Sequence, residues 1–150
     1  MAGRVEGIFI TDTKAVLPEP VERVEAVAGT GLRGNRYFFA DRVAPSGTAI
    51  TLIAAEALEA FESETGIPLS PAESRRNVLV RGIDVNALVG KRFRIGDVEC
   101  EATRLCEPCQ YLTDLVGRPI LEPLVHRAGI RARILTGGEI AVGDEVAPLN

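Results

Sequence analysis

Two cysteines three positions apart are the residues of this sequence best suited to chemistry. They form the segment Cys106-Glu-Pro-Cys109, which the residue pattern places between the end of a strand and the start of a helix. The amino terminus of a helix stabilises a thiolate, the nucleophilic form of cysteine. Arg104 would favour that charged form, whereas Glu107 would oppose it unless its side chain points away. Cys109, nearer to the predicted helix start, is therefore the favoured reactive thiol, with Cys106 beside it.

Other interpretations of this cysteine pair remain open. Both thiols could be buried apolar groups that only pack. A structural zinc site needs four ligands, and adding Cys100 and His126 gives an irregular set. Thiol-disulfide exchange fits the strand-to-helix position, although the strand-rich sequence around it lacks a βαβ setting. His126 is the only histidine, so a Cys-His catalytic pair would have to use it.

Arginines at predicted loops and strand ends form a second set of candidates. Nearly all positive charge in the chain is arginine, because Lys14 and Lys91 are the only lysines. A guanidinium group binds phosphate and other oxyanions through two parallel hydrogen bonds. The residues that could converge on an anionic ligand are Arg33, Arg36, Arg75, Arg76 and Arg104. For each one alone, a solvated surface side chain is the simpler interpretation.

The glycine-rich segment 29–36 is a candidate for close approach by a ligand. It contains three glycines and an Asn, which favour unusual backbone angles. It has neither the Gly-Lys-Ser/Thr ending of a phosphate-binding P-loop nor the spacing of a dinucleotide fingerprint. An ordinary tight loop is the simpler interpretation.

Composition limits the classes to which the protein can belong. The chain has 150 residues, 46% apolar and 25% charged, which fits one folded domain over residues 1–150. The net charge of -4 argues against nucleic acid and anionic membrane as partners. Three cysteines cannot all pair within the chain, and no apolar run reaches the roughly 18 residues of a membrane span. Residues 1–10 lack a signal segment, so we expect a soluble, cytoplasmic protein.

Strands dominate the elements that must position these side chains. Alternating and β-rich runs predict strands over 5–11, 20–28, 48–53, 77–81, 89–95, 98–104, 130–135 and 140–147. Residues 89–104 form a predicted hairpin around Gly96-Asp97, and the last two strands form a predicted closing pair across Thr136-Gly-Gly138. The second hairpin strand leads directly into the cysteine pair.

Predicted helices are short and few. The clearest covers 54–65 and ends at Gly66, and a turn or two begins at the N-cap Ser70 and ends at Arg75. Further helical patterns cover 109–116 and 120–126. Strands in adjacent pairs, with few helices between them, predict a mainly β fold: an antiparallel barrel with a few short inserted helices.

Several short segments resemble a known family when taken in order. They are Gly31-Leu-Arg-Gly-Asn-Arg36, Thr51-Leu-Ile-Ala-Ala-Glu56, Arg75-Arg-Asn-Val-Leu-Val80, residues 89–97, Arg104-Leu-Cys-Glu-Pro-Cys109, residues 127–138 and Ile140-Ala-Val-Gly-Asp144. Together they resemble the MOSC domain, named for the carboxy-terminal region of molybdenum cofactor sulfurase. The likeness runs from about Gly29 to Val146.

The resemblance implies a barrel of the pyruvate-kinase-barrel-like kind that binds the molybdopterin form of the molybdenum cofactor. It implies that Cys109 either ligates molybdenum or carries sulfur as a persulfide, with Cys106 able to assist. It also implies that Arg76, Asn77 and Arg104 line the site of the pterin phosphate. Small members of the family often read Gly-Asp-Arg-His in the early loop, where this chain reads Gly34-Asn-Arg-Tyr37.

Three functions follow from these expectations. The first is a thiol-dependent molybdenum protein that reduces N-hydroxylated small molecules with an electron-transfer partner, or transfers sulfur through a cysteine persulfide. The second is a non-catalytic sulfur carrier that accepts sulfur from a separate cysteine desulfurase, because the chain has no room for a pyridoxal phosphate domain. The third is a dithiol redox protein that uses Cys106 and Cys109.

Overall fold

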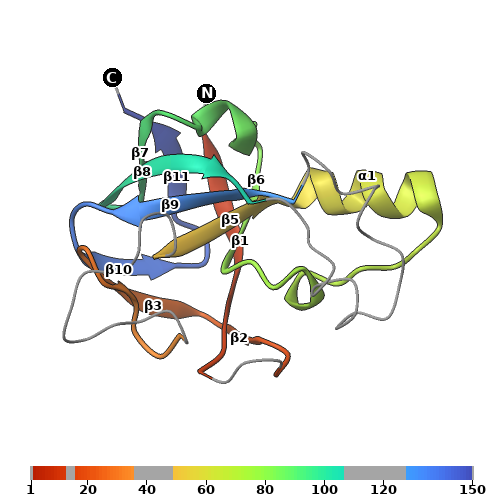
Figure 1. Ribbon diagram of the computed structural model, residues 1–150, viewed down its shortest axis with the longest axis horizontal. Coiled ribbons are helices and arrows are strands. Elements are labelled where there is room, and N and C mark those ends of the chain that lie inside the picture. The colour runs from red at the N-terminus through yellow and green to blue at the C-terminus, as the bar shows by residue number, and fades with distance from the viewer. Residues whose placement is uncertain (1, 13–15, 36–48, 107–127, 150) are drawn as a thin grey trace.

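Strands are the main secondary structure in the computed structural model, which describes residues 2–12, 16–35, 49–106 and 128–149 (Figure 1). The strands are β1 (Gly3–Ile10), β2 (Glu19–Val21), β3 (Arg23–Val27), β4 (Gly31–Leu32), β5 (Ile50–Ala54), β6 (Val78–Arg81), β7 (Arg92–Ile95), β8 (Val98–Leu105), β9 (Ile130–Ile134), β10 (Gly138–Ala141) and β11 (Glu145–Pro148). The helices are α1 (Ala55–Thr65) and two 3-10 helices, η1 (Ala72–Ser74) and η2 (Val85–Leu88). The predicted helices over 109–116 and 120–126 lie outside the described residues.

The larger sheet closes into a barrel, which confirms the predicted fold class. Its eight strands follow the order β11-β7-β8-β9-β5-β6-β1-β2, and β11 also pairs with β1. With β2 left outside, the other seven strands form a ring. Neighbouring strands are antiparallel except β5 and β6, which run parallel. The predicted hairpin of residues 89–104 is confirmed as β7 and β8.

Alternation along each strand fills the barrel interior. Side chains such as Ile50 and Leu52 on β5, and Val78 and Val80 on β6, belong to one buried cluster that also takes in Phe93, Ile95, Cys100, Ile130 and Val146. Burying one such side chain contributes roughly 1.5–3 kcal/mol. The residues between them point to the outer wall, where they pack against other elements or face solvent.

A second, smaller cluster packs α1 against the outer wall. It joins Leu58 and Phe61 of α1 to Ile53 of β5 and Leu79 of β6. The helix ends at Gly66 in the left-handed conformation, as predicted. Arg81 of β6 donates to Glu59 of α1 at 2.7 Å, and this hydrogen bond lowers the pKa of Glu59. Figure 1 shows α1 beside the barrel, beyond the end of β5.

Two predicted strands are each two strands, because the chain passes between the barrel and a three-stranded sheet of order β10-β3-β4. Residues 20–28 bend at Glu22, so that β2 pairs with β1 while β3 pairs with β10. Residues 140–147 break at the turn Val142-Gly-Asp144, where Gly143 has φ 97°. The two bends meet, since Val142 N–H donates to the Glu22 carbonyl at 2.9 Å.

The predicted pairing of the last two strands was wrong, because β9 lies between β8 and β5, and β10 pairs with β3. The predicted glycine-rich loop also contains the short strand β4. The predicted turn after Ser70 is the 3-10 helix η1, whose N-cap is Pro71, one residue later than predicted. Ser70 still makes reciprocal bonds with Glu73: its hydroxyl accepts from Glu73 N–H, and the Glu73 carboxylate accepts from Ser70 N–H. No helix in the described part of the chain is long and apolar enough to cross a membrane.

Candidate functional site

Cys106 follows directly after β8, at one end of the barrel. β5 and β6 end there and β9 begins there, because Leu105 pairs with Ile130 and β5 is antiparallel to β9. Cys106 N–H donates to the Gly129 carbonyl at 2.8 Å, which extends the β8–β9 ladder by one residue. The residue is 3% exposed, and its thiol forms no disulfide. Cys109 lies outside the described residues, so its roles stay predictions.

The buried guanidinium of Arg76 connects Cys106 to the chain on the far side of residues 107–127. Its Nη2 donates to the Cys106 carbonyl at 3.0 Å and its Nε donates to the Ala128 carbonyl at 2.7 Å. Its Nη1 donates to the Ser74 carbonyl at 3.3 Å. The two ends of that stretch are therefore fastened to one side chain. The predicted cofactor contact of Arg76 stays a prediction.

The amide of Asn77 fastens the start of β6 to both of its neighbours. Its Oδ1 accepts from the N–H and the hydroxyl of Thr51, each at 3.1 Å, and its Nδ2 donates to the Phe9 carbonyl at 3.3 Å. Phe9 N–H in turn donates to the Asn77 carbonyl at 2.7 Å. This side chain thus links β1, β5 and β6. Its predicted cofactor contact is likewise untested.

Arg104 and Arg131 are direct cross-strand partners on β8 and β9. Ala102, Ile130 and Ala132 face the core, so the two arginines lie on the outer wall. Within the described ranges neither guanidinium makes a hydrogen bond or an ion pair. The sequence pointed to Arg104 but not to Arg131. The alternation in Ile130-Arg-Ala-Arg-Ile134 was the available signal, but only the strand register shows which residue lies opposite Arg104.

The other predicted arginines lie apart from this pair. Arg33 belongs to the small sheet region, where its Nε donates to Glu25 at 2.7 Å. Arg75 adopts the left-handed conformation, with φ 59°, and its Nη1 donates to the Val16 carbonyl at 2.9 Å. Arg36 lies outside the described residues. The described candidates therefore do not all converge: Arg76 contacts Cys106, Arg104 precedes it on β8, and Arg33 is engaged elsewhere.

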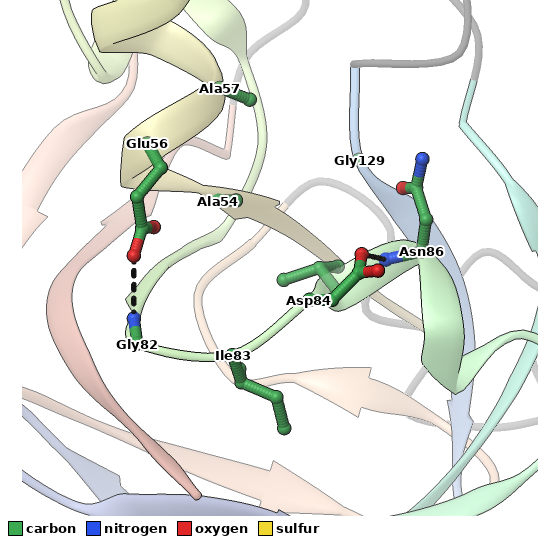
Figure 2. Close-up of a pocket in the computed structure, with 9 residues that line it drawn as sticks. Ala54, Glu56, Ala57, Gly82, Ile83, Asp84, Asn86 and Gly129 are labelled. Carbon is green, nitrogen blue, oxygen red and sulfur yellow. Dashed lines mark hydrogen bonds between the residues drawn. The ribbon is translucent and has the colours of Figure 1, made fainter. Parts of the chain in front are cut away.

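A cavity of about 440 Å³ opens at the same end of the barrel (Figure 2). Its described lining runs from the start of α1 to η2 and reaches Gly129, the residue that accepts from Cys106. The Glu56 carboxylate accepts from Gly82 N–H at 2.8 Å, and Asp84 accepts from Asn86 N–H at 3.1 Å. Both carboxylates therefore serve to shape the loop that borders the cavity.

The third cysteine, Cys100, belongs to the barrel interior. Burial raises the pKa of its thiol to about 12, with a smaller contribution from Glu99. A neutral thiol there packs as an apolar group. Among the residues that the structure describes, no group of three His, Cys, Asp or Glu side chains is placed to hold a metal ion. Cys100 thus takes no part in a described metal site.

Comparisons with known proteins agree with this fold. Among solved structures, the YuaD protein from Bacillus subtilis aligns with a TM-score of 0.85 at 20% identity, covering 97% of this chain and 94% of that one. YiiM from Geobacillus stearothermophilus aligns with a TM-score of 0.78 at 16% identity, covering 99% and 75%. YiiM from Escherichia coli aligns with a TM-score of 0.72 at 15% identity, covering 98% and 70%. No curated protein matches the sequence.

The family comparison extends this likeness from fold to sequence. The model of the MOSC domain matches residues 34–147, which is most of the chain and includes the cysteine pair, both barrel hairpin strands and the closing turn before β11. The protein therefore belongs to the MOSC domain family.

Proposed function

We propose that this protein binds the molybdenum cofactor in its molybdopterin form and uses Cys109 as the thiol that acts with it. The supporting observation is the family match over residues 34–147, a range that contains Cys106-Glu-Pro-Cys109 in sequence with Arg104. The expected reaction is the reduction of an N-hydroxylated small molecule, with electrons from a separate partner.

The chemistry of the available side chains fits such a group. A thiolate is a soft ligand suited to molybdenum, and guanidinium groups suit a phosphate. Arg104 is exposed and makes no ion pair within the described chain, so its charge is available to an anion. When bound, the molybdenum centre would supply the electron-transfer chemistry. Cys109 would be its protein ligand, and Arg104 would hold the anionic part of the pterin.

The described residues would contribute by fixing where the reactive segment begins. The backbone at Cys106 is held on both sides, by Gly129 at 2.8 Å and by Arg76 at 3.0 Å. Cys106 is itself buried, which favours Cys109 as the thiol that meets a ligand. A fixed entry point limits the positions that the next residues can take, and such pre-organisation assists both binding and catalysis.

Measuring molybdenum and pterin in the purified protein tests this function. The protein should be expressed in a host that makes the cofactor, and a Cys109→Ser variant prepared in parallel. We expect both components to co-purify with the wild type. The variant should contain less molybdenum per protein molecule. If neither molybdenum nor pterin is found, even after reconstitution with isolated cofactor, the cofactor hypothesis is wrong.

A sulfur-carrier function is the second candidate, and burial of Cys106 leaves one thiol to carry the sulfur. A cysteine desulfurase would pass the terminal sulfur of its own persulfide to the Cys109 thiolate. Cys109 would become a persulfide and the desulfurase cysteine would return to a thiolate. Mass spectrometry after incubation with a desulfurase and cysteine should then show one added sulfur atom on Cys109.

A dithiol redox function would instead require Cys106, and full activity of Cys106→Ser would contradict it.

A further inference from the structure

The cavity at the end of the barrel has two negative charges in its described wall and no positive one. Its volume is about 440 Å³, and Glu56 and Asp84 are the charged side chains of the described lining. Neither carboxylate forms an ion pair within residues 2–12, 16–35, 49–106 and 128–149. Glu22 and Asp97 also lack an ion pair there, but neither lines this cavity. The distinctive feature is therefore that two unneutralised carboxylates meet at one cavity.

Hydrogen bonds to the backbone hold both carboxylates in the wall. Glu56 Oε2 accepts from Gly82 N–H at 2.8 Å, and Asp84 Oδ1 accepts from Asn86 N–H at 3.1 Å. Figure 2 shows the Glu56 carboxylate next to Gly82, at one end of the short loop that borders the cavity, and the Asp84 carboxylate at the other end. The second oxygen of each carboxylate has no hydrogen bond to the described chain. Because a carboxylate has about four acceptor positions, each group can still accept from a ligand.

Four apolar side chains make up much of the remaining described lining: Ala54, Ala57, Ile83 and Val85. Small-molecule sites have this character, with volumes of roughly 300–1,000 Å³ and a few polar groups in an apolar wall. The amino terminus of α1 also lies in the lining, but it contributes a partial charge of only about +0.5, less than the two carboxylates. The cavity therefore favours a ligand that has both an apolar part and a positive charge.

An organic cation fits this wall better than a metal ion does. Ca²⁺ and Mg²⁺ each need about six or more oxygen ligands. In the part of the chain that the structure describes, no group of three His, Cys, Asp or Glu side chains is placed to hold a metal ion. An ammonium or guanidinium group needs fewer partners, because each of its N–H donors can form a charge-assisted hydrogen bond with a single carboxylate oxygen.

We infer that this cavity binds a small organic cation, whose ammonium or guanidinium group is held by the carboxylates of Glu56 and Asp84. The cavity reaches Gly129, whose carbonyl accepts from Cys106 N–H at 2.8 Å. A ligand there would lie beside the start of the segment Cys106-Glu-Pro-Cys109. The inference deepens the proposed function, on which it rests for the purpose of the site, by making the substrate a positively charged molecule. Binding of the cation itself needs no molybdenum.

Calorimetric titration of the purified chain with benzylamine and with phenylguanidine tests the inference. Benzyl alcohol and phenylurea are neutral molecules of similar shape, and they should bind at least about tenfold more weakly. Glu56→Gln and Asp84→Asn should each weaken binding of the cations about three- to tenfold, and the double variant should reduce it below detection. Each new amide keeps a carbonyl oxygen for the N–H of Gly82 or Asn86, so the loop should keep its shape. Glu62→Gln is the matched control, because Glu62 is an exposed acid of α1 outside the described lining, and it should keep the affinity within about twofold.

Melting temperature separates a lost site from a lost fold. Asparagine caps a helix as well as aspartate does, so Asp84→Asn should melt close to the wild type, as should Glu56→Gln. Binding of phenylguanidine alone supports a planar cation as the ligand, and binding of benzylamine alone supports a compact ammonium group. The inference is overturned if the wild type binds neither cation, if the neutral molecules bind equally well, or if the double variant binds as the wild type does. Failure to bind either cation in a protein that contains molybdenum and pterin contradicts this inference alone, and the reverse result contradicts the proposed function alone.

Discussion

Arg76 is the one charged residue that is buried in the described part of the chain, at 9% exposure. Replacing it with Met would leave the carbonyls of Cys106, Ala128 and Ser74 without their donors. Because unsatisfied buried acceptors are costly, we expect Arg76→Met to lower the free energy of unfolding by about 2–4 kcal/mol. Cys106 should also become more reactive toward a thiol-labelling reagent. Urea denaturation and mass spectrometry of the labelled protein measure the two effects.

Arg92→Met provides the control for Arg76→Met. Arg92 is exposed and contacts Glu99 at 3.5 Å, so its loss should cost less than about 1 kcal/mol and leave Cys106 labelling unchanged. Arg76→Lys keeps the charge, but an ammonium group cannot reach three carbonyls in one plane. Its loss of stability and its Cys106 labelling should therefore lie between those of Arg92→Met and Arg76→Met. Equal labelling of Cys106 in all three variants would contradict a positioning role for Arg76.

The thiol of Cys100 predicts a loss of stability at alkaline pH. Its pKa in the folded barrel is about 12, against an ordinary value of 9.0, because burial disfavours the thiolate. A raised folded pKa stabilises the protein fully below pH 9, and this contribution falls by about 1.4 kcal/mol per pH unit as the pH rises toward 12. The difference in unfolding free energy between wild type and Cys100→Ala should therefore shrink between pH 9 and pH 11. A constant difference would mean that the thiol is not buried as described.

At the residue scale, the sequence identified which residues could do chemistry but not which residues they contact. The Cys-x-x-Cys spacing and Arg104 stand out in the sequence because their chemistry is local. The bonds of Arg76 to two carbonyls on either side of residues 107–127 depend on long-range folding. The opposition of Arg104 and Arg131 depends on strand register, which a bulge between Ala102 and Arg104 shifts by one residue.

At the scale of elements, Gly129 limits how β9 can begin. A Cβ at this position would lie 2.0 Å from the Leu52 carbonyl oxygen, and φ is 96°. Gly129→Ala should therefore cost about 3–5 kcal/mol, combining left-handed strain with a backbone clash. Gly143, with φ 97° and no atom within 4 Å of the place a Cβ would take, is the matched position. Gly143→Ala should cost only about 1–2 kcal/mol, and equal unfolding free energies for the two variants would refute the clash.

Elements with a strong local signal were predicted well. Helix 54–65 has helix-forming residues and a terminal glycine, and hairpin 89–104 has a two-residue turn, so both could be placed before the fold was known. The strands over 20–28 and 140–147 could not be divided correctly. Their breaks at Glu22 and Val142 exist because each segment leaves one sheet for another, and no local pattern encodes that exchange.

At the scale of the whole molecule, the barrel is closed by contacts between its first and last strands. Val146 of β11 pairs with Gly3 of β1 and with Ile95 of β7, and it is fully buried. Val146→Ala should lower the free energy of unfolding by about 1–3 kcal/mol and speed amide hydrogen exchange in β1, β7 and β11 together. Val142→Ala, at an exposed position, should change stability by less than about 0.5 kcal/mol. Faster exchange confined to β11 would contradict cooperative closure.

The mainly β barrel was predictable because strands in adjacent pairs outnumber helices. The parallel β5–β6 pair was not, although its connection explains why α1 lies outside the ring. Parallel neighbours need a crossover, and α1 with η1 forms it.

Ring closure also has a consequence for synthesis on the ribosome. The chain emerges from its amino terminus, so β1 is made more than a hundred residues before β11, its partner in the ring. Until β11 leaves the exit tunnel, the edges of β1 and β7 that it will join are open to other strands. The nascent barrel therefore closes only after Pro148, the last residue of β11, has left the exit tunnel.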